Sequence, residues 1–144
     1  MNLIFIVLIF SFIGVGLEVF WTSIIDYIKT RNPRLEGKSY FWVFFVYGIV
    51  PFVYLIVLNW FGSTSIFVRG ILYMILFYLL EFISGYTLKI IFGVSPWDYS
   101  GYKINLFGKK IKSDFLGVIC LNYLPVWYIY GILGEFLFKF FLKI

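Results

Sequence analysis

The sequence predicts an all-α protein, a polytopic membrane helix bundle of four transmembrane helices. Hydrophobic residues make up 62% of the chain and charged residues only 13%, with a mean hydropathy of +0.98. This composition is far more apolar than that of soluble domains. The apolar residues fall into four runs, each long enough for the roughly 20 residues that a helix needs to cross the hydrocarbon core. We therefore expect one integral membrane domain, residues 1–144.

The first two spans follow from long runs with almost no charge. The first covers about residues 2–25, and its only charged residue is Glu18. It lacks the basic start and small-residue exit of a cleaved signal peptide, so we interpret it as a permanent span. The second covers about residues 39–61 without any charge, and Pro51 inside it predicts a local kink.

The last two spans are longer and carry more polar residues. They cover about residues 65–92 and about residues 115–142, which exceeds what a hydrocarbon core of roughly 30 Å requires, so we expect them to tilt, kink or protrude. Near the start of the third span, Arg69 is expected to extend to the interface, and in the fourth span Glu135 is expected to pair with Lys139 one turn later.

Basic residues concentrate in two of the three connections. The first connection contains Lys29, Arg31, Arg34 and Lys38, and the third contains Lys103, Lys109, Lys110 and Lys112. The positive-inside rule predicts a multi-pass protein of the cell membrane with both of these loops in the cytoplasm and both termini outside. Because the charges lie between spans and not on one stripe, we expect no nucleic-acid partner.

A weak internal similarity leaves two interpretations open. Residues 40–49 align without gaps on residues 123–132 with five identities in ten, and Leu17-Glu18 matches Leu80-Glu81. The bundle then consists of two parallel hairpin repeats, or else the match arises by chance in a biased composition.

Three polar residues inside the spans are candidate site residues. Glu18 lies on a helical stripe with Ser11, Gly14 and Thr22, which we expect to face protein. Glu81 and Asn122 are predicted at similar depth, in the cytoplasmic half of the bundle. Because charged groups in the bilayer are costly, by about 2.5–3.5 kcal/mol on insertion scales, we expect a shared polar pocket. The alternative is that both glutamates only join helices through hydrogen bonds.

The third connection, about residues 93–114, is expected to be structured. It contains turn residues, a potential strand at residues 102–106, and aromatic residues suited to the membrane interface. We interpret it as a lid over the pocket, although an interfacial loop that only joins helices remains the alternative. The candidate ligand-binding residues are Glu18, Glu81, Trp97, Asp98, Tyr99, Ser100, Asn105 and Asn122.

Familiar catalytic motifs are missing from the sequence. The chain has no histidine and one cysteine, Cys120, which excludes imidazole metal sites, Ser-His triads and an internal disulfide. Gly37-Lys38-Ser39 resembles the end of a phosphate-binding loop, but Asn32 occupies the position of the required first glycine. No ATPase motif is present.

Three segments carry a resemblance to a known family: Glu81-Phe82-Ile83-Ser84-Gly85-Tyr86, Trp97-Asp98-Tyr99-Ser100, and Asn105-Leu106-Phe107-Gly108. Together with Gly14, Glu18 and Tyr47-Gly48, they resemble the putative ABC-transporter type IV (CmpB-like) membrane family, which is similar to transmembrane protein 229. The resemblance implies a permease. Family members often carry a further acid after the Glu-x-x-x-Gly-Tyr element, where this chain has Leu88-Lys89, so no role for that acid transfers.

Three functions remain open from the sequence. The first is binding of a small solute, ion or lipid headgroup, as a transporter component or membrane accessory factor. The second is an intramembrane lipid-modifying enzyme in which Glu18, Glu81 and Asp98 act as acid and base or hold a divalent cation. The third is a structural subunit of a larger complex. Expected partners are membrane lipids and a second copy or other subunits.

Overall fold

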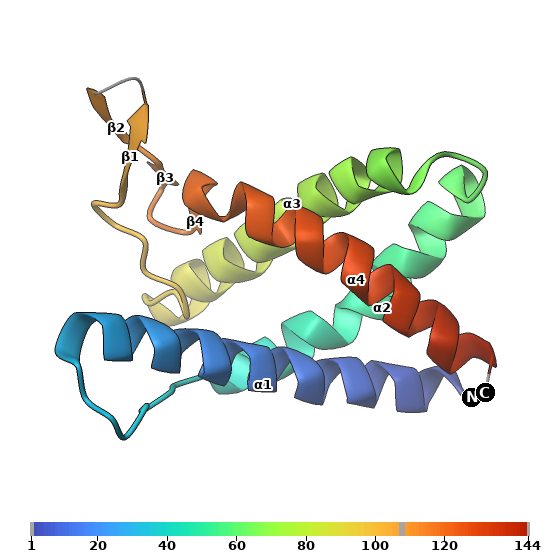
Figure 1. The fold of residues 1–144 in the computed structure, drawn as a ribbon, viewed down its shortest axis with the longest axis horizontal. Coiled ribbons are helices and arrows are strands. Elements are labelled where there is room, and N and C mark those ends of the chain that lie inside the picture. Colours follow the sequence, from blue (N-terminus) through green and yellow to red (C-terminus); the bar gives the residue numbers. More distant parts are fainter. Residues whose placement is uncertain (1, 107–108, 144) are drawn as a thin grey trace. The chain divides into compact units, whose positions relative to one another are not determined.

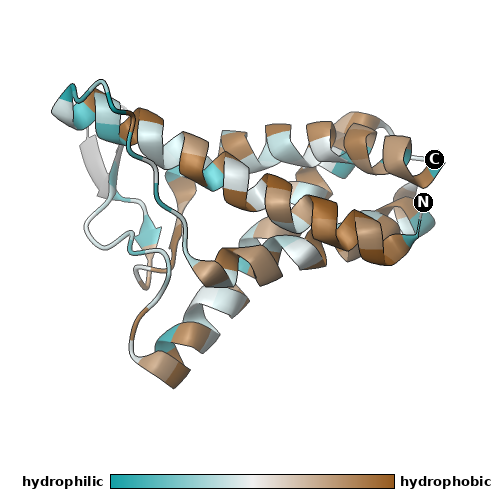
Figure 2. Ribbon diagram, turned by 90° about the horizontal axis from the view of Figure 1, so that it is seen from below, coloured by the Kyte–Doolittle hydropathy of each residue, from teal (hydrophilic) through white to brown (hydrophobic). Residues whose placement is uncertain are grey.

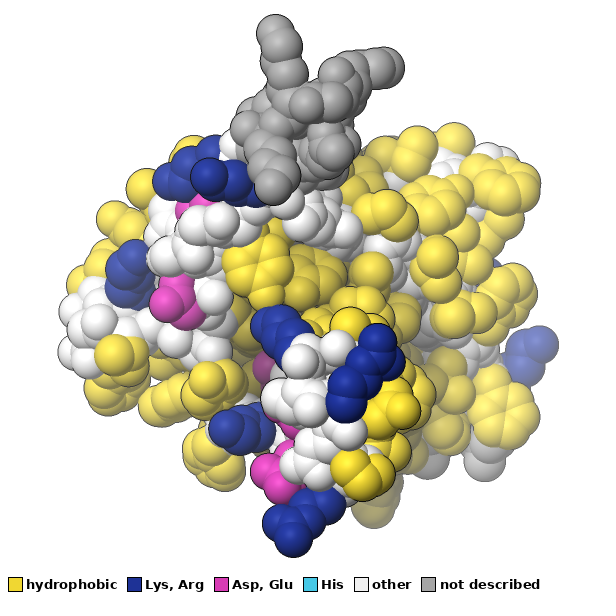
Figure 3. All heavy atoms as spheres, turned by 60° about the vertical axis from the view of Figure 1, so that its left-hand side comes forward, with side chains coloured by type: hydrophobic (Ala, Val, Ile, Leu, Met, Phe, Trp, Pro, Cys, Tyr) yellow, Lys and Arg dark blue, Asp and Glu magenta, His cyan; other side chains and the backbone are white. Residues whose placement is uncertain are grey.

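The computed structural model describes residues 2–106 and 109–143, and its side chains outside residues 104–111. Four long helices dominate these ranges: α1 (Leu3–Thr30), α2 (Phe41–Phe61), α3 (Ile66–Phe92) and α4 (Leu124–Lys143) (Figure 1). Each is long and apolar enough to cross a membrane, α4 together with the turn before it. Apolar residues run along the helices in Figure 2 and cover much of the surface visible in Figure 3. The predicted helical membrane class is confirmed.

The third connection is longer than predicted, and the fourth span begins later. Residues 115–120, which the sequence assigned to the helix, belong to short strands and the turn between them, and α4 begins at Leu124. Leu116 and Gly117 both have positive φ values, of 54° and 71°, which turn the chain and cannot continue a helix. The elements of this connection are β1 (Lys103–Leu106), β2 (Lys109–Lys112), β3 (Asp114–Phe115), β4 (Ile119–Cys120) and a 3₁₀ turn, η1 (Leu121–Tyr123).

The chain divides into two compact units, residues 1–51 and residues 52–144. In the first unit, α1 packs on the beginning of α2 through small residues. Tyr47 lies against Gly14, and the hydroxyl of Ser11 lies against Gly48. Farther along α1, Thr22 bonds both to the backbone N–H and to the carbonyl of Lys38, each at 2.8 Å. The prediction that the stripe of Ser11, Gly14 and Thr22 faces protein is confirmed.

Two glycines on α1 provide a matched test of this packing. A methyl group at Gly14 would clash with the Tyr47 ring, whereas at Gly16 nothing lies within 4 Å. We expect Gly14→Ala to lower the free energy of unfolding by about 1–3 kcal/mol through overpacking. Gly16→Ala should raise it by roughly 0.5–1 kcal/mol, because alanine is the better helix former. Unfolding in detergent micelles measures both, and equal effects would contradict this packing.

In the second unit, α3 and α4 pack against each other, joined by the end of α2. Gly131 of α4 lies against the side chain of Tyr73, which is fully buried. The Tyr54 ring stacks on Phe138 with centroids 5.6 Å apart, and its hydroxyl donates to the carbonyl of Tyr130. The core of this unit is therefore mainly aromatic.

Internal contacts of the two units resemble each other. Gly48 packs on α1 at Ser11, seven residues before Glu18. Gly131, which aligns with Gly48, packs on α3 at Tyr73, eight residues before Glu81. In each unit a Tyr-Gly pair, Tyr47-Gly48 or Tyr130-Gly131, thus packs on the other helix seven or eight residues before its glutamate. The repeat stays a prediction, with this similarity in its favour.

Candidate functional site

A buried carboxylate forms the centre of the candidate site in the second unit. The side chain belongs to Glu81 of α3, a residue that is only 4% exposed. The hydroxyl of Tyr99 donates to its Oε1 at 2.8 Å, and the indole Nε1 of Trp127 donates to its Oε2 at 3.2 Å. Tyr99 comes from the third connection and Trp127 from α4. One carboxylate therefore joins three segments that are far apart in the sequence.

Further aromatic rings lie next to Tyr99. The Tyr99 ring lies 5.5 Å from the Tyr123 ring and 5.8 Å from the Tyr102 ring, between centroids. We call Glu81, Tyr99, Tyr123 and Trp127 the Glu81 cluster. A carboxylate attracts cations by its charge, and tyrosine and tryptophan rings near it can add a cation–π interaction.

The Trp-Asp-Tyr-Ser segment builds the cluster by alternating its side chains. Trp97 lies against Gly85, where an added Cβ would come within 3.4 Å of the indole Cε3. Tyr99 reaches Glu81, which lies four residues before Gly85 and hence on the same face of α3. A hydrogen bond of 2.9 Å from the Tyr99 N–H to the carbonyl of Gly117 holds the segment in place.

The other two residues of the segment, Asp98 and Ser100, are exposed and form a turn. The N–H of Ser100 donates to Asp98 Oδ1 at 3.0 Å. Hydrogen bonds from the side chain and backbone of Ser100 lower the pKa of Asp98, with a smaller contribution from the charge of Lys89. Both residues therefore serve this exposed turn.

The strands that follow attach the connection to α3. The hydroxyl of Tyr78 donates to the carbonyl of Cys120 at 2.6 Å, and Val118 packs under Gly85. The ammonium group of Lys89 donates to the carbonyl of Leu116. The prediction of a structured third connection is confirmed.

The remaining predicted site residues belong to other elements of the chain. Glu18 belongs to the first unit, where the hydroxyl of Ser39 donates to its Oε2 at 2.6 Å. Asn122 is exposed in η1 and not two turns inside a helix, because α4 begins later than predicted. Asn105 is in β1, and its side chain lies outside the described part of the structure. That these residues share one pocket with Glu81 stays a prediction.

A second buried polar cluster was not predicted from the sequence. Arg69 is 7% exposed and Glu135 is 1% exposed, and their side chains form a two-pronged ion pair with both N–O distances at 2.7 Å. Tyr73 and Lys139 also donate to the same carboxylate. The predicted Glu135–Lys139 pair is confirmed. That Arg69 extends to the interface stays a prediction, and its ion pair with Glu135 was not expected.

Arg69 also organises the turn between α2 and α3. Its Nη1 donates to the carbonyls of Gly62 and Thr64. An arginine can satisfy a carboxylate and two carbonyls at once because its five N–H groups form a rigid fork. This cluster has the geometry of a structural site, since Arg69 and Tyr73 join α3 to α4 and Arg69 also holds the turn before α3.

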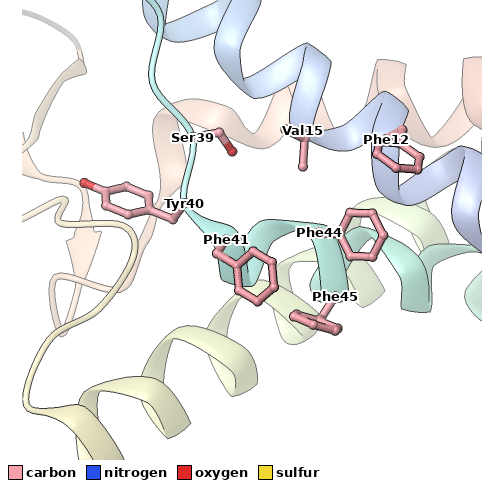
Figure 4. Close-up of a pocket in the computed structure, with 7 residues that line it drawn as sticks. All are labelled: Phe12, Val15, Ser39, Tyr40, Phe41, Phe44 and Phe45. Atoms are coloured by element: carbon pink, nitrogen blue, oxygen red, sulfur yellow. The ribbon is translucent and has the colours of Figure 1, made fainter.

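The first unit carries an apolar groove of about 470 Å³ between α1 and α2 (Figure 4). It is lined by Phe12, Val15, Ser39, Tyr40, Phe41, Phe44 and Phe45. The lining is almost entirely hydrocarbon and aromatic, which suits lipid chains better than a polar solute. The Glu81 cluster is therefore the better candidate for a polar site than this groove.

Metal-binding residues do not gather in the described part of the chain. Within residues 2–106 and 109–143, no three His, Cys, Asp or Glu side chains lie close enough to hold a metal ion. The candidate site is thus one carboxylate in an aromatic environment.

Comparison with known proteins gives a family. No solved structure matches this chain. A family model described as "Putative ABC-transporter type IV" matches residues 4–143, which is nearly the whole chain. The matched region includes all four membrane helices and the Glu81 cluster. The chain is therefore a multi-pass membrane protein that belongs to the "Putative ABC-transporter type IV" family.

Proposed function

We propose that this protein is a membrane component of a transport system and that the Glu81 cluster binds the positively charged group of a small solute or lipid headgroup. The observation that carries the proposal is the hydrogen bond from Tyr99 to Glu81, which joins the third connection to a membrane helix. Charged residues within spans are costly and commonly mark a substrate or ion pathway. A carboxylate together with neighbouring tyrosine and tryptophan rings is a combination that suits substituted ammonium groups.

The third connection acts in this proposal as the lid of the site. Tyr99 and Trp97 belong to the lid, and they contact Glu81 and Gly85 of α3, which forms the opposite side of the site. A cation that binds Glu81 competes with or reorients the Tyr99 hydroxyl, so binding and lid position are coupled. Substrate-controlled loops of this kind are common in proteins that must admit and release a ligand.

Choline chloride is a suitable test ligand because it carries a quaternary ammonium group. We expect choline to raise the melting temperature of the purified protein above that in sodium chloride at equal concentration. The rise should be about 2–4 °C for each kcal/mol of binding free energy. Glu81→Gln should abolish the difference, because it removes the charge and keeps the shape.

Glu18→Gln is the matched control for this experiment. If it preserves the choline effect, the Glu81 cluster alone carries the site. If it abolishes the effect as Glu81→Gln does, the pocket shared with Glu18 is the better description. No choline effect on the wild-type protein at any concentration would contradict the proposal and favour a structural subunit.

We also propose that both termini lie outside the cell and that the two basic connections lie in the cytoplasm, as the lysine and arginine distribution predicts. In a Cys120→Ser background, a membrane-impermeant maleimide added to intact cells should label Ser63→Cys. It should label Glu36→Cys only after the membrane is opened. The reverse pattern would overturn this orientation.

A further inference from the structure

The hairpin of β1 and β2 places like charges opposite each other. Its register pairs Lys103 with Lys112 and Asn105 with Lys110. Directly opposed residues of an antiparallel ladder share one face, and so do residues two apart on one strand. One face of the hairpin therefore holds Lys103, Lys110 and Lys112, together with Asn105.

This arrangement opposes hairpin formation when nothing neutralises it. Like charges directly across a ladder are destabilising, and a two-stranded hairpin is only marginally stable in water. Residues 103–114 contain four lysines and one acid, Asp114. Asp114 Oδ2 lies 3.4 Å from the Lys112 ammonium group, whose side chain is still 69% exposed. Lys103 and Lys112 are both exposed, and one acid does not balance the four lysines of this segment.

We propose that this lysine face binds the phosphate groups of anionic phospholipids in the membrane that the helices span. Charge complementarity favours an anionic surface, which contributes about 1 kcal/mol per nearby lysine or arginine. Geometry favours the membrane as its source, because the hairpin follows α3 after residues 93–102 and the next turn is bonded to α3 through Lys89 (Figure 1). The register also pairs two apolar residues, Ile104 and Ile111, on the other face.

Hydrogen exchange in lipid nanodiscs tests this proposal on the intact protein. We expect the backbone amides of β1 and β2 to exchange roughly tenfold more slowly in nanodiscs of phosphatidylglycerol than in nanodiscs of phosphatidylcholine. Lys103→Gln should reduce that ratio several-fold while it leaves the Lys112–Asp114 pair in place. Lys29→Gln, which removes a lysine of the first basic connection, should leave the ratio unchanged.

A second readout separates anion binding from simple loss of structure. In phosphatidylcholine, Lys103→Gln should exchange more slowly than the wild type, because it removes the repulsion with Lys112. Inorganic phosphate added to phosphatidylcholine nanodiscs should protect the hairpin far less than phosphatidylglycerol does. Equal exchange in both lipids, or full protection by inorganic phosphate, would overturn the proposal. Neither result bears on the Glu81 cluster, which this experiment leaves intact.

Discussion

Replacing Glu135 with leucine is expected to lower the free energy of unfolding by about 3–5 kcal/mol, the usual effect of removing one partner of a buried ion pair. The substitution leaves the guanidinium of Arg69 buried without its carboxylate. It also removes the acceptor of the buried Tyr73 hydroxyl. Denaturation in mixed detergent micelles measures the change.

The double variant Arg69→Met, Glu135→Leu should be more stable than Glu135→Leu alone. Replacing a whole buried pair by apolar residues is often nearly neutral, because no unpaired charge remains. Lys139→Met is the matched control, since the Lys139 side chain is 43% exposed and its pair is a local one. It should cost less than about 1 kcal/mol. Strictly additive losses in the double variant would contradict a coupled pair.

Replacing Glu81 with leucine is expected to release the third connection from α3. The Tyr99 hydroxyl and the Trp127 N–H, both half-buried, lose their acceptor. A fully buried donor left unpaired costs about 1–3 kcal/mol, so we expect a loss of this order from the two together. The backbone N–H groups of Tyr99 and Tyr102 bond within the connection, so their exchange reports its order. We expect their hydrogen exchange to become at least roughly tenfold faster, since about 1.4 kcal/mol corresponds to a factor of ten.

Two further variants make this result specific. Tyr99→Phe removes only the bond from the connection, and in combination with Glu81→Leu it should add little further loss. Ser84→Ala is the control on the same helix, because the Ser84 hydroxyl bonds to carbonyls of its own helix, at Leu80 and Glu81. It should leave exchange in the connection unchanged. Unaltered exchange in Glu81→Leu would show that the carboxylate does not hold the connection.

The helices could be predicted from the sequence, but the start of α4 could not. Long apolar runs identify α1 to α3, and the polar stripe on α1 identifies the side that packs on α2. Residues 115–120 are equally apolar, and a short apolar run does not distinguish a strand from a helix. The turn at Leu116 and Gly117 ends any helix in this segment. In the sequence, only the glycine indicates such a turn.

The pairing of Arg69 with Glu135 could not be predicted from local patterns. These residues are 66 positions apart, while Lys139 offered Glu135 a partner one turn away. The Glu135 carboxylate accepts hydrogen bonds from both Lys139 and Arg69. Because Lys139 already explained the charge of Glu135, local patterns offered no reason to look for a second partner. Two opposite charges in different predicted spans were the available signal, because neither is well tolerated alone.

The association of Glu81 with the third connection was predicted, but the roles within it were not. Trp97, Asp98, Tyr99 and Ser100 were all expected to contribute to the site. In an extended segment successive side chains point to opposite sides, so only two of the four can face α3. Trp97 and Tyr99 do so, and the neighbouring Asp98 forms the exposed turn. In the sequence, the alternation of aromatic and polar residues in this segment indicates which side chains face α3 and which face solvent.

The central claim is that a cation binds at the carboxylate held by Tyr99 and Trp127. The most direct measurement is the nitrogen-15 spectrum of the five tryptophan side chains in micelles during titration with choline chloride. We predict a saturable shift of the Trp127 indole N–H that sodium chloride does not cause and that Glu81→Gln removes. An unmoved Trp127 resonance, or the same shift with Glu81→Gln, would contradict it.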